Sequence, residues 1–166
     1  MTTTEKTTTS APTTFRGVVA TPELEQNLQK VLVDLVALHL EGKQFHWNVL
    51  GRNFRDLHLQ LDEVVDLARE HSDAIAERMR ALYAVPDGSP RTVAATTTLP
   101  QQPTGELDTT EAVNAITDLL QRTAETVRGV HDAVDAEDPS TADLLHSVIV
   151  DLEKQAWMIS AENRRA

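Results

Sequence analysis

The chain of 166 residues contains no cysteine. Disulfide bonds, thiolate nucleophiles, zinc fingers and cysteine-ligated iron–sulfur clusters are therefore excluded. It also lacks an apolar run approaching the roughly 20 residues that span a bilayer. Its threonine-rich beginning has no apolar segment of the kind found in signal peptides. These absences predict a cytoplasmic protein with no membrane partner.

Positive charge is scarce as well, with 15 Lys and Arg against 26 Asp and Glu and a formal net charge of −11. Such a surface repels nucleic-acid phosphates over a Debye length of about 8–10 Å and attracts cations. The 40% of hydrophobic and 25% of charged residues are typical of a soluble globular domain. Composition alone favours a metal-handling protein over a nucleic-acid binder.

Helical patterns fill most of the chain after residue 20. Residues 1–20, rich in Thr and poor in apolar side chains, predict a disordered tail, and residues 21–166 predict one domain. Apolar spacing predicts helices over about 22–47, from 54 to the turn at 85–88, over 109–136 and over 141–163. Thr21 is the expected N-cap of the first helix. Asn53 with Asp56, and Asp108 with Glu111, resemble capping boxes.

The connection between the second and third helices is unusually long. Residues 89–106 are rich in Thr, Pro and Gln, which indicates a crossover containing a short helical piece. Two helical hairpins joined by such a connection predict an all-α fold. The pattern is that of a ferritin-like four-helix bundle with a long crossover between helices 2 and 3.

Three candidate metal donors surround the first hairpin turn. His46 lies just before the turn and His58 just after it, so both sit at a similar height, and Asp62 follows His58 by one helical turn. Two imidazoles and a carboxylate suit Fe(II), Zn(II) or Mn(II). The alternative is local capping and packing by the two histidines, with a solvated Asp62.

Asp73 and Glu77 carry two further donors on the same face of the second helix. They lie ~16 Å and ~22 Å from Asp62 along the helix, too far for one site within one chain. Antiparallel crossing with a second copy, centred near the small Ala68, places them opposite the partner's Asp62 and His58. The alternative is a solvated acidic face. No Glu in the sequence has a His three residues later, so the usual Glu-x-x-His pair of an intrasubunit di-iron site is absent.

The stretches FHWNVLGRNFRDLHLQLDE and HSDAIAERMRAL resemble the signature of the Dps family, DNA-binding mini-ferritins of starved cells. The segment TADLLHSVIVDLEKQAWMISA, with Trp157, resembles that family's fourth helix. The likeness covers residues from about 22 to 162. It implies a ferroxidase centre shared between subunits. His46, His58 and Asp62 of one subunit, with Asp73 and Glu77 of its twofold mate, would be both the iron ligands and the catalytic residues.

The resemblance also implies a hollow homododecamer built from twofold dimers. Such an assembly oxidises Fe(II), preferably with hydrogen peroxide, stores Fe(III) mineral and protects DNA from oxidative damage. Trp47 matches a family aromatic near the centre that intercepts stray oxidising equivalents. A core aromatic at the end of the helix is the alternative for Trp47.

Acidic residues gather at the turn between the last two helices. In the resembled family, carboxylates in this region line a threefold pore through which Fe(II) enters. Asp138 and Asp143 are the candidates here. Helix capping around Pro139, by Asp138 or Ser140, is the alternative and is compatible with a pore.

DNA contact is the point at which the chain departs from the family pattern. The basic residues of the tails are few: Lys6, Arg16, Arg164 and Arg165. Affinity for DNA follows the number of phosphates neutralised, so weak, salt-sensitive binding or none is expected. Two other functions remain open: a DNA-compacting protein with little metal chemistry, located at the nucleoid, and a Zn(II)- or Mn(II)-buffering assembly.

Overall fold

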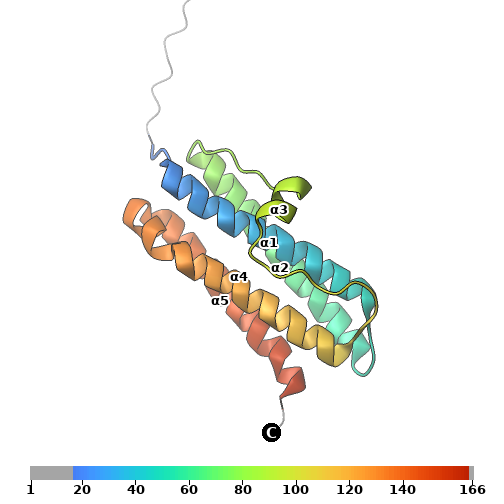
Figure 1. Cartoon of the computed structure of the whole chain (residues 1–166). Helices are drawn as coiled ribbons and strands as arrows, with labels where there is room; N and C mark the ends of the chain where they lie inside the picture. The colour runs from blue at the N-terminus through green and yellow to red at the C-terminus, as the bar shows by residue number, and fades with distance from the viewer. Residues whose placement is uncertain (1–16, 165–166) are drawn as a thin grey trace, which may run out of the picture.

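A computed structural model describes residues 17–164 of the chain (Figure 1). The tail prediction for residues 1–16, and the candidate DNA contacts Lys6, Arg16 and Arg165, lie outside these residues. The elements in chain order are α1 (Pro22–Asn48), β1 (Val49–Leu50), α2 (Phe54–Ala81), α3 (Pro90–Thr96), β2 (Leu107–Asp108), α4 (Thr109–Glu137), α5 (Pro139–Ser160) and the 3₁₀ turn η1 (Ala161–Asn163). None of the helices in this part of the chain is long and apolar enough to cross a membrane.

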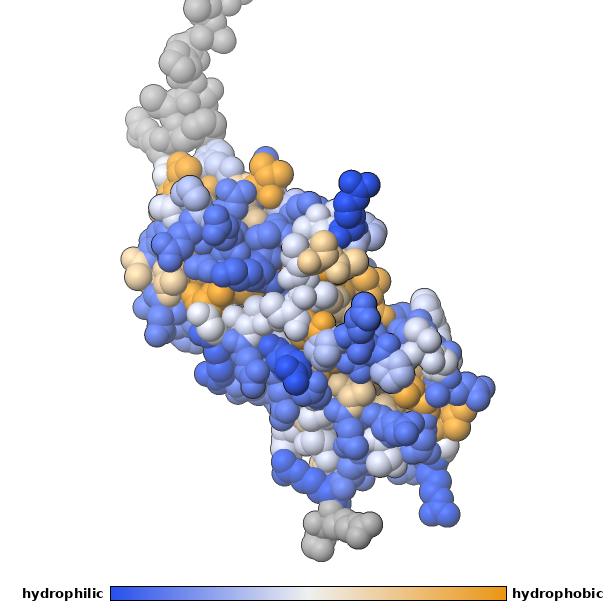
Figure 2. All heavy atoms as spheres, viewed as in Figure 1, coloured by the Kyte–Doolittle hydropathy of each residue, from blue (hydrophilic) through white to orange (hydrophobic). Residues whose placement is uncertain are grey.

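Four long helices form the bundle. α1 packs against α2, and α4 against α5, while α1 also contacts α4 and α2 contacts α5. The core between them is almost entirely aliphatic, and its largest fully buried side chains include Phe45, Leu61, Ile116 and Leu145. Figure 2 shows a mainly hydrophilic outer face with small separate apolar areas. The predicted all-α ferritin-like bundle is confirmed.

Two of the three predicted N-caps are present. The Thr21 hydroxyl accepts from the Leu24 amide, and the Asp108 carboxylate accepts from the Thr110 amide at 2.8 Å. The predicted capping box at Asn53 is wrong. Asn53 adopts a left-handed conformation with φ 57°, and its side chain makes no capping bond. It donates instead to Glu162 at 3.3 Å, because the tight hairpin turns the side chain toward η1.

A two-residue parallel bridge, which the sequence did not predict, fixes the α1–α2 turn. Val49 pairs with Leu107 and Leu50 with Asp108, so the turn is bonded to the end of the crossover. Gly51 follows with φ +118°, and an added Cβ would lie 3.1 Å from the carboxylate of Asp108 and the hydroxyl of Thr109. The turn that carries the two candidate histidines is therefore held from outside the hairpin.

The crossover is fastened at its middle by a buried carboxylate. It leaves the far end of α2, forms α3 and runs over the surface to the start of α4 (Figure 1). Asp34 of α1 is fully buried and accepts hydrogen bonds from Thr97, Thr98 and Thr126. These donors replace the water that a buried carboxylate loses. Because α2 and α4 start at the same end of the bundle, the crossover must span its length.

Candidate metal centre

His46 and His58 meet at the α1–α2 hairpin. Their rings stack with centroids 3.7 Å apart. The Nδ1 of each ring lies 2.9 Å from the backbone carbonyl oxygen of the other histidine. A carbonyl oxygen only accepts, so each Nδ1 carries the hydrogen and each neutral ring keeps its lone pair on Nε2. Metal-binding histidines are commonly oriented by such a bond from the second ring nitrogen.

Asp62 joins the two histidines. Its Oδ1 lies 3.2 Å from Nδ1 of His46 and 2.6 Å from the Nζ of Lys43. The hydrogen bond from Lys43 is the main cause that lowers the pKa of Asp62, and the charge of Lys43, together with that of either imidazole when it is protonated, adds to it. A carboxylate held ionised beside two imidazoles attracts cations. The Lys43 ammonium is the positive group that pairs with it here.

Asp73 and Glu77 lie further along α2, and both are exposed. Neither makes a hydrogen bond or an ion pair with any residue in 17–164. Within this range no three His, Asp or Glu side chains are grouped so that they could hold a metal ion. The chain thus brings His46 and His58 together with Asp62 beside His46, which is not a complete metal site by itself, and leaves Asp73 and Glu77 apart, as the length of the helix requires.

Trp47, next to His46, is not a core residue. Its side chain is 68% exposed, so the alternative of a buried aromatic at the end of the helix is wrong for the single chain. It borders an open, mainly apolar groove with Leu40, Lys43 and Pro103. Because successive helical residues point about 100° apart, a buried His46 directs its neighbour outward.

Asp138 and Asp143 have different environments. Asp138 is buried, and its carboxylate accepts from Arg78 at 2.6 Å and from the Thr141 hydroxyl. Burial by itself raises the pKa of Asp138, but hydrogen bonds from Thr141 and Arg78 outweigh it and bring the pKa below its ordinary value. Asp143 is exposed, and its Oδ1 lies 3.9 Å from the Nδ1 of His146. Of the two candidates, only Asp143 is accessible on the single chain.

Three histidines away from the α1–α2 turn have partners that the sequence did not indicate. His71 is buried and lies 3.0 Å from Asp151 of α5. His131 and His146 bring their rings to a centroid distance of 4.3 Å across the α4–α5 hairpin. The facing positions on antiparallel helices were the only signal in the sequence that could have paired His131 with His146.

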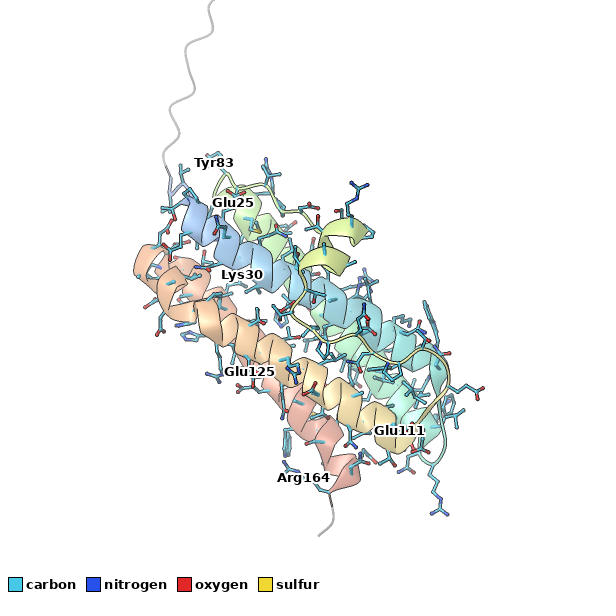
Figure 3. The ribbon with its side chains drawn as sticks, in the orientation of Figure 1. Glu25, Lys30, Tyr83, Glu111, Glu125 and Arg164 are labelled. Atoms are coloured by element: carbon cyan, nitrogen blue, oxygen red, sulfur yellow. The ribbon has the colours of Figure 1, made fainter. Side chains whose placement is uncertain are left out.

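Arg164 is the only candidate DNA contact among the described residues. It lies just beyond η1, and Figure 3 shows it at the opposite end of the bundle from Tyr83. It borders an open groove between α4 and α5 together with Arg128, Glu153 and Trp157. Each of the two helices contributes a glutamate to the lining of this groove, so no continuous basic surface surrounds Arg164.

Comparison with known proteins agrees with this architecture. The ferritin-like domain family model matches residues 25–165. The chain is 34% identical over 136 residues to DNA protection during starvation protein 2 of Deinococcus radiodurans, which covers 82% of this chain and 56% of that protein. It is 33% identical over 135 residues to the DNA protection during starvation protein of Agrobacterium fabrum, covering 81% and 83% of the two chains.

A solved structure of Dps from Microbacterium arborescens, in its high iron form, superposes with a TM-score of 0.81 at 30% identity. The match covers 88% of this chain and 98% of that one. The fold and the family match define a ferritin-like protein. Within that class, the chain belongs to the Dps family, the DNA protection during starvation proteins. The chain spans just over half the length of the Deinococcus relative.

Proposed function

We propose that this protein oxidises Fe(II) and stores Fe(III), and thereby protects the cell from peroxide. The observation that carries the proposal is the arrangement of His46, His58 and Asp62. Two imidazoles are held with Nε2 available, beside an ionised carboxylate. The solved relative from Microbacterium arborescens is named as a high iron form, which supports iron as the metal.

The centre is completed by a second copy. Asp73 and Glu77 are exposed, without partners in their own chain, and spaced four residues apart as His58 and Asp62 are. Antiparallel crossing of α2 with its twin brings them opposite those two residues. Twelve chains arranged as twofold dimers into a hollow shell would place all such centres at dimer contacts.

Each side chain has a separate role in this centre. The carboxylates of Asp62, Asp73 and Glu77 hold the more tightly bound Fe(II), and the imidazoles bind a second, weaker one. Two Fe(II) ions each give one electron to a single hydrogen peroxide, which takes two protons and leaves as two water molecules. Taking both electrons together avoids release of a hydroxyl radical. Trp47, the residue next to His46, would intercept stray oxidising equivalents.

Entry of Fe(II) and contact with DNA are secondary parts of the proposal. Asp143, exposed at the start of α5, is the carboxylate available to line an entry pore. Asp138 supports this turn from inside through Arg78. The net charge of −11 and the acidic surroundings of Arg164 favour weak DNA binding at most.

The decisive experiment is complementation between two inactive variants. His58→Ala and Asp73→Ala are each expected to lose rapid peroxide-dependent Fe(II) oxidation. Co-refolded, they form heterodimers in which one shared centre carries both lesions and the other is intact, so about half of the centres in each heterodimer regain activity. No recovery in verified mixed assemblies would contradict a shared centre.

The remaining alternatives have their own readouts. A Zn(II)- or Mn(II)-buffering protein would bind these metals at the same residues without consuming peroxide. Peroxide consumed per Fe(II), measured with and without competing Zn(II), separates buffering from oxidation. A DNA-compacting protein with little metal chemistry would retard DNA at moderate salt and show no Fe(II) oxidation.

A further inference from the structure

The exposed face of α2 carries two opposite charges, both of which act electrostatically on the nearby His39 of α1. Asp66 and Arg69 are both exposed, and neither makes an ion pair or a hydrogen bond with any residue between 17 and 164. They border an open hollow of about 550 Å³ that also reaches Asp73. Between them in the sequence lies Ala68, which is completely buried.

Helix geometry puts these charges on the same face as the candidate metal donors. At about 100° per residue, Asp62, Asp66, Arg69 and Asp73 all point within roughly 60° of one another. The antiparallel crossing that sets Asp62 opposite the partner's Asp73 is centred between residues 67 and 68. Asp66 and Arg69 lie equally far on either side of that centre. Each therefore faces the oppositely charged residue of the other copy.

We propose that Asp66 of each subunit forms an ion pair with the partner's Arg69, and that these two reciprocal pairs fix the register of the α2–α2 contact. The inference rests on the shared centre of the proposed function, since both use the same crossing. Asp66 and Arg69 lie nearer the twofold axis than any of the metal donors on α2. They therefore act as positioning residues and need not touch the metal.

The two charges disfavour any shift in the register of the α2–α2 contact. A shift of the contact centre toward residue 66 would bring the Asp66 carboxylates of both copies face to face. A shift toward residue 69 would oppose the two guanidinium groups. Both shifts also separate Asp62 from the partner's Asp73. Like charges in contact disfavour the wrong arrangements, while the opposite charges favour the correct one.

An apolar contact supports the same register. Leu59 is 48% exposed on the single chain. In the crossing described it faces the partner's Ala76, a small, half-buried residue on the same side of α2. A large apolar side chain is thus matched with a small one on either side of the axis, outside the two ion pairs.

Charge exchange tests the proposal without iron. Asp66→Arg opposes two arginines across the axis, twice in each dimer, and Arg69→Asp opposes two aspartates. Each single variant is expected to shift toward monomer in sedimentation velocity at low salt, with wild-type helicity by circular dichroism. The double variant D66R/R69D restores opposite charges and is expected to regain the wild-type assembly. Asp135→Arg is the matched control, because it makes the same charge change as Asp66→Arg at an exposed position on α4, outside the α2 contact.

Mixing the two single variants gives a sharper result. Every heterodimer between them carries two opposite-charge pairs, so the mixture is expected to assemble as mixed dimers, visible by native mass spectrometry. Wild-type assembly by both single variants, or no recovery in both the double variant and the mixture, would overturn the proposal. Because no iron is present, such a failure leaves the iron proposal standing. Loss of Fe(II) oxidation in a correctly assembled double variant would count against the iron proposal alone.

Discussion

Asp138 illustrates how a single residue gains a structural role from contacts distant in the sequence. Its carboxylate is 5% exposed and bonded to Arg78, which comes from α2. A buried carboxylate without its cation would carry an uncompensated charge, so the two side chains stabilise one another. The contact ties the beginning of α5 to the last turns of α2, on which Glu77 also lies.

Replacement of Asp138 should therefore show a characteristic pH dependence. The pKa of Asp138 is lowered in the folded chain, so its contribution is present above the ordinary Asp value of about 3.9 and is lost as pH falls through the folded pKa. Asp138→Asn is expected to lower stability by about 1–3 kcal/mol at neutral pH. The difference from wild type should shrink below about pH 4.

Thermal unfolding from neutral pH down to about pH 3 measures this difference. Asp135→Asn is the control, because Asp135 is exposed on α4 and makes no hydrogen bond or ion pair with any residue in 17–164. An Asp138→Asn deficit that stays constant over the whole pH range would contradict the assignment.

At the scale of elements, the α1–α2 hairpin depends on a turn fixed from outside. The β1–β2 bridge bonds this turn to the end of the crossover, and Gly51 provides the backbone conformation that the close approach requires. The carbonyl oxygens that orient the histidine rings belong to the two helix ends next to this turn. Strain introduced here should reach the two stacked histidine rings of the candidate metal centre.

Gly51→Ala tests this dependence. With φ +118° and a Cβ 3.1 Å from Asp108 and Thr109, the variant is expected to lose about 1–3 kcal/mol of stability. Gly129→Ala is the matched control. Gly129 lies inside α4 with nothing within 4 Å of an added Cβ, so alanine there should stabilise by about 0.5–1 kcal/mol. Melting temperatures of the two variants should move in opposite directions, and equal shifts would contradict this account of the turn.

At the scale of the whole molecule, charge and symmetry decide which partners are available. In the assembly proposed above, a chain with a net charge of −11 would form an acidic shell. Attraction of cations and repulsion of nucleic-acid phosphates would follow from the same surface potential. Multivalency can still amplify weak contacts from basic tails at low ionic strength.

Two measurements on the native particle test this view. Native mass spectrometry is expected to give about twelve chains built from twofold dimers.

In gel-shift assays the particle is expected to retard DNA weakly at low salt and not at physiological salt. R164A/R165A should remove the low-salt shift, with Arg91→Ala, an exposed arginine on α3, as the control. Retardation that persists at physiological salt would contradict the charge argument.

The sequence by itself determined the four helices, the long crossover and the converging positions of His46 and His58, because helical periodicity and spacing are local properties. It did not reveal the left-handed Asn53 or the β1–β2 bridge. Only the tertiary structure decided that Lys43 pairs with Asp62 and that Asp138 is buried against Arg78. Each of those contacts joins residues on different helices, and the free energy of such a pair depends on burial and geometry that no local pattern records.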